Sequence, residues 1–179
     1  MFRYFAKGRR GIVYKGKYKG KDVILKVESR DLRRINNEIL WLKRLNKFKI
    51  GPKMIFSGDG WFIYEFVKGI PLNEWVVGKR KVKKVLLGIL EKCRVMDKLR
   101  VNKEEMHRPF KNVLVYKGKA KLIDFERCNI RLKPKNVTQF CQFIILVLKL
   151  DRRKVLPHLR KYHKNQNDKN FKELVKVLF

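Results

Sequence analysis

Asp22-Val23-Ile24-Leu25-Lys26-Val27 predicts a β-strand, because it is a short, mostly apolar run rich in β-branched residues that follows a turn signal. Side chains alternate along a strand, so Lys26 shares a face with Ile24. Such a lysine either lies at an edge with its ammonium group in water or faces a partner of opposite charge. The second explanation requires an acidic residue on a neighbouring element.

Glu38 is the acidic residue that the pattern favours as this partner. In the helix predicted after the strand, Glu38 falls within the apolar stripe that contains Ile35 and Leu42. A carboxylate buried in this way needs a partner. We therefore expect an ion pair between Glu38 and Lys26, and Glu28 is the alternative acid.

The first 67 residues contain five predicted strands around this one helix. The strands are Phe2 to Ala6, Ile12 to Tyr18, Asp22 to Val27, Met54 to Ser57 and Trp61 to Val67. Hairpin turns are predicted at residues 18–22 and 57–60. The helix is predicted from about Asp31 to Asn46, with an N-cap at Ser29 or Asp31 and a stop at Gly51-Pro52.

After Gly69-Ile70-Pro71 the pattern becomes mostly helical. An apolar stripe from Val82 to Met96 predicts a helix of about five turns. Further helices are predicted at Val137 to Leu150, Arg153 to Lys161 and Phe171 to Leu178, and a hairpin at Val113 to Tyr116 with Ala120 to Ile123. Without an internal repeat or a long linker, residues 1–179 are interpreted as one domain.

Residues 6–13, Ala6-Lys7-Gly8-Arg9-Arg10-Gly11-Ile12-Val13, resemble the glycine-rich loop of protein kinases, with Ala6 in place of the first glycine. The resemblance implies that Gly8, Gly11 and Val13 lie against ATP. Val23-Ile24-Leu25-Lys26 resembles the kinase strand whose lysine contacts the α and β phosphates of ATP.

Three further positions extend the resemblance in the same order along the chain. Glu38 corresponds to the helix glutamate that positions the lysine, and Glu65 to Val67 correspond to the hinge that binds adenine. Lys121-Leu122-Ile123-Asp124-Phe125-Glu126 is similar to the strand that ends in D-F-G, with Glu126 in place of the glycine. Asn112 precedes Asp124 by 12 residues, and the resemblance implies that both hold Mg²⁺.

The resemblance covers residues 2 to 126 and implies an α+β, bilobal, protein-kinase-like fold. The expected N-lobe, about 1–67, holds five antiparallel strands and one helix; the hinge is about 65–71; a reduced helical C-lobe spans about 72–179. The short segment after Asp124 leaves no room for an activation segment. In this brevity the chain is similar to the small atypical kinases of archaea, including the RIO and KEOPS kinases.

The implied activity is Mg-ATP-dependent phosphotransfer to a protein or tRNA hydroxyl, as in an atypical minimal Ser/Thr protein kinase. The aspartate expected five residues before Asn112 is absent, and His107 occupies that position. His107 is the candidate base, and Glu104 or Glu105 are alternatives. The alternative function is a pseudokinase or ATPase that acts as a nucleotide-dependent RNA-binding module.

The charge balance favours a polyanionic partner. The chain has 47 Lys and Arg against 16 Asp and Glu, a formal net charge of +31. A hyperthermophile composition is the alternative explanation, although it ordinarily raises Glu together with Lys. The basic runs proposed to bind nucleic acid are residues 79–84, 152–154, and the set Arg160, Lys161 and Lys164.

The remaining composition favours a cytoplasmic protein. Cys93, Cys128 and Cys141 are odd in number and too widely spaced for a disulfide framework or a zinc site. The N-terminal residues lack a signal-peptide pattern. The longest apolar run, Phe140 to Leu150, is too short to cross a bilayer, so we expect no membrane span.

Overall fold

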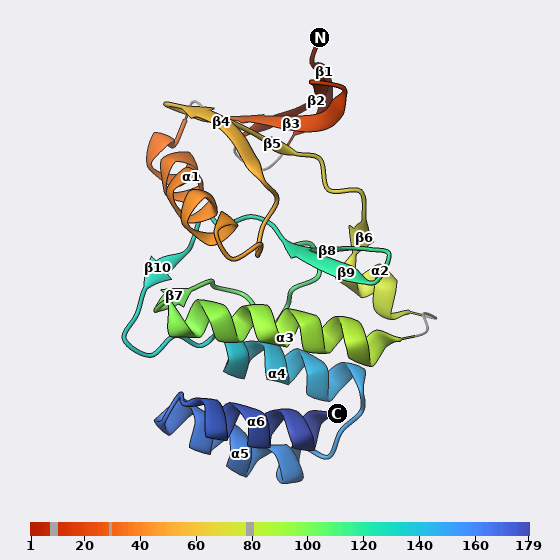
Figure 1. The fold of residues 1–179 in the computed structure, drawn as a ribbon, viewed down its shortest axis with the longest axis vertical. Helices are drawn as coiled ribbons and strands as arrows, with labels where there is room; N and C mark the ends of the chain where they lie inside the picture. Colours follow the sequence, from red (N-terminus) through yellow and green to blue (C-terminus); the bar gives the residue numbers. More distant parts are fainter. Residues whose placement is uncertain (8–10, 29, 78–80) are drawn as a thin grey trace. The chain divides into compact units, whose positions relative to one another are not determined.

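The computed structural model describes residues 1–7, 11–28, 30–77 and 81–179. Figure 1 shows the course of the chain through its strands and helices. The chain forms two compact units, and neither is continuous in sequence. The first unit contains Met1–Lys68 and Lys121–Cys128, and the second contains Gly69–Ala120 and Asn129–Phe179.

The first unit is built on a five-stranded antiparallel sheet with the strand order β1-β2-β3-β5-β4. The strands are β1 (Arg3–Lys7), β2 (Ile12–Tyr18), β3 (Lys21–Val27), β4 (Met54–Gly58) and β5 (Trp61–Glu65). Residues Lys19 and Gly20 both have positive φ, 47° and 74°, which fits the tight β2–β3 hairpin. This sheet was expected from the sequence, although β5 ends two residues earlier than predicted.

Helix α1 (Leu32–Asn46) buries one face, as its periodicity predicted. The buried residues are Ile35, Glu38, Ile39, Trp41, Leu42 and Leu45. The predicted N-cap position and the predicted last residue are both confirmed. Asp31 is the N-cap residue but its side chain caps no amide and instead pairs with Arg34 at 2.8 Å. The helix ends at Asn46, before Gly51-Pro52, and the Asn46 side chain bonds the Pro52 carbonyl and the Met54 amide.

The segment Lys121–Cys128 completes the first unit by bonding to α1 and to the residues that follow it. The Leu122 amide donates to the Ile50 carbonyl at 3.1 Å. The Asn37 side chain donates to the carbonyls of Glu126 and Cys128, at 2.8 and 3.0 Å. Phe125 is buried, with 1% of its surface exposed. This segment is thus fixed to Ile50 before Phe125 and to α1 after it.

The second unit is mainly helical. Its helices are α2 (Leu72–Val76), α3 (Val82–Lys98), α4 (Asn136–Val147), α5 (Arg152–Lys164) and α6 (Asp168–Leu178). Its strands are β6 (Ile70–Pro71), β7 (Val101–Asn102), β8 (Val113–Tyr116), β9 (Lys119–Leu122), whose last two residues count with the first unit, and β10 (Asn129–Ile130). Helix α4 packs between α3 and α5, and α5 packs on α6.

Several predicted boundaries of the second unit shift, and its shortest elements were not predicted. Helix α4 ends at Val147, not Leu150, because the chain turns at Lys149, which has a φ of 51°. Asp151 and Asn167 cap α5 and α6 by accepting the amides of Arg153 and Asn170, so α6 begins earlier than predicted. Strand β9 ends at Leu122, one residue before the prediction.

The described residues thus form an α+β protein with a five-stranded antiparallel sheet and six helices. None of these helices is both long and apolar enough to cross a bilayer. The bilobal kinase-like arrangement stays a prediction.

Candidate functional site

Lys26 and Glu38 form the expected ion pair within the first unit. The Lys26 Nζ on β3 lies 2.6 Å from the Glu38 Oε2 on α1, and the two side chains are 22% and 6% exposed. The second oxygen of Glu38 accepts the amide of Phe125 at 3.4 Å. Glu28, the alternative acid, instead accepts the amide of Arg30. Glu38 therefore links β3 to the segment Lys121–Cys128.

Burial and charge together set the protonation of this pair. Burial by itself would lower the pKa of Lys26, but the carboxylates of Glu38 and Asp124 raise it above its ordinary value, so the lysine stays charged. Burial raises the pKa of Glu38, the Lys26 ammonium opposes this rise, and the Asp124 carboxylate adds to it. The cluster holds one ammonium and two carboxylates within electrostatic reach of one another.

Asp124 lies two residues after the end of β9 and is exposed to solvent, with a φ of 62°. This left-handed backbone conformation is costly for most residues, and aspartate and asparagine tolerate it best after glycine. Asp124 acts on the pKa values of Lys26, Glu38 and Tyr64. The structure therefore brings Lys26, Glu38 and Asp124, three of the predicted site residues, into one cluster.

Tyr64 and Phe125 belong to this cluster and were not predicted as site residues. Tyr64 pairs with Ile24 across β3 and β5, so it shares the sheet face of Lys26. Burial and the Glu38 carboxylate raise the pKa of Tyr64, so its phenol stays protonated. The alternation of Phe62 and Tyr64 along β5 was the signal available, but the sequence does not reveal the cross-strand register.

Gly11 and Val13 border the same part of the sheet. Val13 lies directly opposite Lys26 in the β2–β3 register, so the two side chains share a face. A Cβ atom at Gly11 would come within 2.7 Å of the Val27 carbonyl oxygen, so the close approach to β3 itself requires glycine here. Gly8, the other predicted phosphate-binding glycine, lies outside the described residues.

The predicted hinge begins at the last residue of β5. The Glu65 amide donates to the Lys53 carbonyl at 2.9 Å, and the Phe66 amide donates to the Asp22 carbonyl at 3.1 Å. Val67 is half-buried and follows in an irregular segment. Because the Glu65 amide already has a protein acceptor, an adenine ring would have to bind other backbone groups of this segment.

The remaining predicted site residues lie in the second unit. Asn112 is half-buried in the turn before β8, and His107 is exposed in an earlier turn. Glu104 accepts a hydrogen bond from Asn129 and lies 3.8 Å from Arg131, so it has structural partners. Across the described ranges, no three His, Cys, Asp or Glu side chains gather as a metal site. A magnesium ion would therefore need other oxygen ligands, such as an amide or phosphates.

The chain was also compared with known proteins. No protein-family model matches it, and no curated protein matches its sequence.

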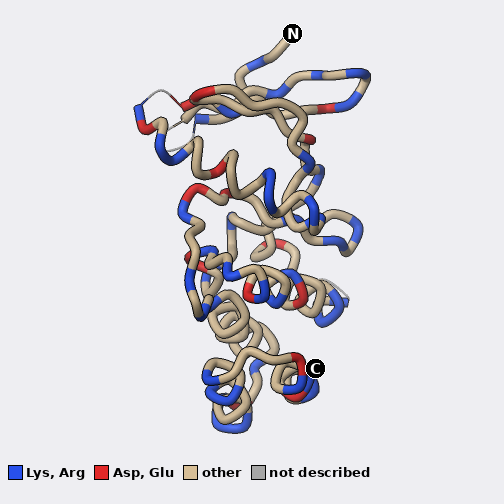
Figure 2. Tube along the Cα trace, turned by 60° about the vertical axis from the view of Figure 1, so that its left-hand side comes forward, with Lys and Arg blue, Asp and Glu red and all other residues tan. Residues whose placement is uncertain are grey.

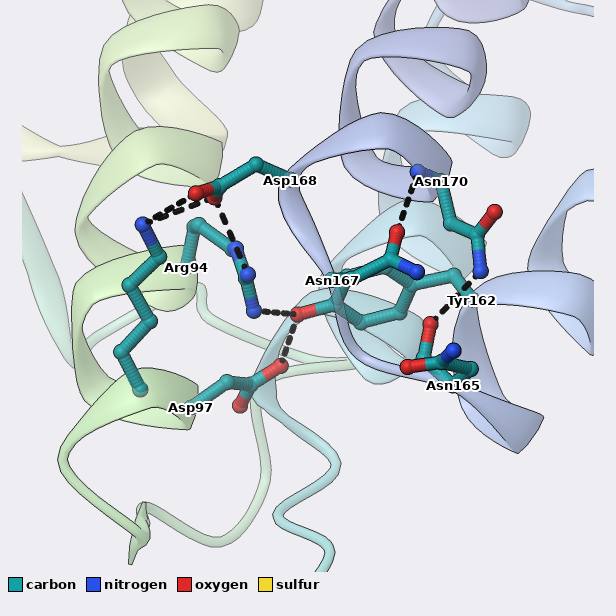
Figure 3. A network of polar contacts seen from close by, with 8 residues as sticks. Arg94, Asp97, Tyr162, Asn165, Asn167, Asp168 and Asn170 are labelled. Atoms are coloured by element: carbon teal, nitrogen blue, oxygen red, sulfur yellow. Dashed lines mark hydrogen bonds and ion pairs between the residues drawn. The ribbon is translucent and has the colours of Figure 1, made fainter.

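A second buried polar cluster lies in the second unit and is drawn in Figure 3. Tyr162 of α5 donates to Asp97 of α3 at 2.9 Å and accepts from Arg94 at 3.0 Å. Asp97 also accepts from the side chain and amide of Asn136 and from the amide of Val137, at 2.7, 3.2 and 3.4 Å. Burial nevertheless raises the pKa of Asp97 to about 6. These bonds join α3, α4 and α5.

Lysine and arginine are spread over both units (Figure 2). In the run 79–84, residues 79 and 80 lie outside the described part of the chain. Lys83 and Lys84 are exposed in the first turn of α3, and Lys83 donates to the Phe179 carbonyl at 3.4 Å. The other predicted basic residues, from Arg152 to Lys164, all lie on α5.

Proposed function

We propose that the protein binds Mg-ATP at the Lys26–Glu38–Asp124 cluster and transfers its terminal phosphoryl group, as an atypical minimal kinase-like phosphotransferase. The carrying observation is the 2.6 Å pair between Lys26 and Glu38, with Asp124 acting electrostatically on both. A lysine held by a buried glutamate keeps one orientation and a permanent charge. Both properties suit a group that positions phosphates.

Each residue of the cluster has a different role in the proposed binding of Mg-ATP. Lys26 offers its partly exposed ammonium group to phosphate oxygens, and Glu38 holds that group in place. The exposed carboxylate of Asp124 is a hard oxygen ligand of the kind that Mg²⁺ prefers. Asn112 is proposed as a second oxygen ligand on the sequence spacing alone. Bound Mg-ATP would supply the phosphoryl group and the neutralising metal charge.

The acceptor in this proposal is a hydroxyl group of a protein or a tRNA, with His107 as the base. His107 is exposed, so it is open to an acceptor. Phosphoryl transfer depends mainly on positioning and electrostatic stabilisation, so it does not require an aspartate as base. The pseudokinase or ATPase alternative is supported by the absence of that aspartate from the sequence.

Asp124→Asn is the sharpest binding test, because asparagine tolerates the left-handed backbone and removes only the charge. Wild type should gain about 5–10 °C in Tm with Mg-ATP at 100 times its Kd. The variant should lose most of this gain. The matched control is Asp151→Asn, which removes an equal charge at the α5 N-cap, where asparagine caps as well. An equal gain in wild type and Asp124→Asn would refute the site.

Turnover is tested with γ-labelled ATP in the presence and absence of tRNA and of cell protein. Label transfer by wild type and by Asp151→Asn, but not by Asp124→Asn, supports a kinase. Release of labelled phosphate without transfer supports an ATPase. Binding without either product supports a pseudokinase.

A further inference from the structure

Helix α5 (Arg152–Lys164) concentrates positive charge without compensating acids. Its 13 residues include Arg152, Arg153, Lys154, Arg160, Lys161 and Lys164, with His158 and His163, and no Asp or Glu. Helix α1 carries one acid, the buried Glu38, α3 carries Glu91 and Asp97, and α4 carries neither acidic nor basic residues. The charge of α5 is therefore distinct from the general basicity of the chain.

Three of the basic residues of α5 form a stripe on the side away from its core. Val155, Leu159 and Tyr162 are the buried residues of the helix. Arg153, Arg160 and Lys164 are exposed and fall on the opposite side at 100° per residue. Along the helix axis Arg153 and Arg160 lie about 10 Å apart, and Arg160 and Lys164 about 6 Å apart. We call these three residues the α5 stripe.

The acids nearest to α5 in sequence are already engaged. Asp151 accepts the amide of Arg153, and Asp168 pairs with Arg94 and Lys98, at 3.1 and 2.7 Å. Glu173 of α6 pairs with Lys161 at 2.6 Å. The neighbouring helix α6 has its own exposed basic residues, Lys169, Lys172 and Lys176, at helical spacing. The α5–α6 pair thus carries excess positive charge at its surface.

At the N-terminal end of α5 the charge placement works against the stability of the helix, whereas the cations of its last turn favour it. Arg152, Arg153 and Lys154 occupy the first turn, at the positive end of the helix dipole, where cations are unfavourable. A placement that opposes local stability is typical of a surface that meets a ligand of opposite charge. An anionic partner bound to these residues would offset the repulsion between their charges and the helix dipole.

We infer that the α5 stripe binds the phosphodiester backbone of a nucleic-acid duplex. Three cations along one helix match a row of phosphates, a contact that requires no base recognition. Tyr162, the one Phe, Tyr or Trp of α5, is buried, so the helix offers no large exposed ring on which unpaired bases could stack. The apolar side of α5 is packed in the core and offers nothing to insert into a lipid surface.

This inference is independent of the proposed function, because α5 contains none of the residues proposed to bind Mg-ATP or to act as the base. The test uses the full chain without nucleotide. Fluorescence anisotropy with a labelled 20-base-pair RNA duplex, and with a DNA duplex of the same sequence, measures Kd over a range of salt. A triple variant, Arg153→Gln with Arg160→Gln and Lys164→Gln, removes the stripe. The control removes three exposed lysines of the first unit: Lys17→Gln, Lys21→Gln and Lys53→Gln.

Wild type should bind at least one duplex with an affinity that falls steeply with salt. The stripe variant should bind at least about 10-fold more weakly in 0.1 M salt, and its salt slope should be shallower by about 2 to 3. The control variant should weaken duplex binding, and change the salt slope, by less than half as much as the stripe variant does. Both variants should keep the Tm of wild type within a few degrees, because all six residues are exposed.

Three results would overturn the inference. The first is no binding of either duplex by wild type at physiological salt. The second is equal weakening by the two triple variants, which would assign binding to net charge alone. The third is stripe-dependent binding to phosphatidylserine vesicles that exceeds binding to the duplexes, which would make a membrane surface the partner.

Discussion

The Asp97 cluster of the second unit and the Lys26 cluster of the first unit differ in how completely their groups are bonded. Asp97, in the second unit, accepts four hydrogen bonds from Tyr162, Asn136 and Val137 and is 4% exposed. Lys26, in the first unit, has one carboxylate at 2.6 Å and a side chain that is 22% exposed. The hydrogen bonds of Asp97 join helices. The Lys26 ammonium group remains partly accessible to a ligand, and for this reason the Lys26 cluster is the candidate site.

The largest expected effect comes from removing Lys26, because the buried Glu38 would lose its ammonium partner and would have to stay charged or take up a proton. Lys26→Ala should lower the free energy of unfolding by about 3–5 kcal/mol, measured by urea denaturation. Lys26→Met combined with Glu38→Leu should restore most of this loss, because it removes both charges. The exposed Lys17→Ala serves as control. A double variant as unstable as Lys26→Ala would show that the pair contributes more than charge compensation.

Tyr162→Phe should have a smaller effect, since it removes one hydroxyl that bonds both Asp97 and Arg94. We expect a loss of about 1–3 kcal/mol in the free energy of unfolding. ATP binding should be unchanged, in contrast to Asp124→Asn. Tyr116→Phe, at an exposed position, is the matched control and should change stability little. Loss of ATP binding in Tyr162→Phe would contradict the assignment of a purely structural role to the Asp97 cluster.

The pH dependence of stability sharpens the same comparison. The native pKa of Asp97 is raised from 3.8 to about 6, so the folded protein holds this proton more tightly than the unfolded chain. Its contribution to stability therefore rises as the pH falls from 7 towards 4. Between pH 7 and pH 5, wild type should gain about 1 kcal/mol relative to Asp97→Asn, which does not titrate. Parallel stability curves for the two proteins would contradict the raised pKa.

The smallest effect is expected at the exposed ion pair between Lys161 and Glu173. Glu173→Gln should leave the Tm of the protein unchanged, because solvent screens exposed pairs. The same variant should strengthen duplex binding, because it removes a negative charge beside the α5 stripe. Asp31→Asn, which removes a charge in the first unit, is the control for duplex affinity. Weaker duplex binding by Glu173→Gln would argue against α5 as the contact surface.

The sequence predicted the Lys26–Glu38 pair because its signal is local. A carboxylate within an apolar helical stripe and a lysine within an apolar strand can each be recognised from periodicity. The left-handed backbone of Asp124 and its electrostatic link to Lys26 depend on how the segment after β9 joins α1. Nothing in the order of residues reports that geometry.

The strands and hydrogen bonds that were not predicted depend on contacts between residues far apart in the sequence. Strands β6, β7 and β10 are two residues each and exist only through their pairing with other strands. Tyr162 and Asp97 lie 65 residues apart, and each has an ordinary place in its helix pattern. By contrast, the five-stranded sheet and α1 were predicted nearly to their ends. Strong alternation and strong helical periodicity identify such elements without tertiary information.

The two segments of the first unit, Met1–Lys68 and Lys121–Cys128, are synthesised at different times. A nascent chain ending at Lys68 contains the sheet and α1 but lacks Phe125, the Phe125 amide that bonds Glu38, and the carbonyls that bond Asn37. These groups arrive only after residues 69–120 have been synthesised, and their docking closes a long loop. The cluster of Lys26, Glu38 and Asp124 can therefore be completed only after residues 69–120, the first segment of the second unit, have been synthesised. A fragment ending at Lys68 would not form the complete cluster.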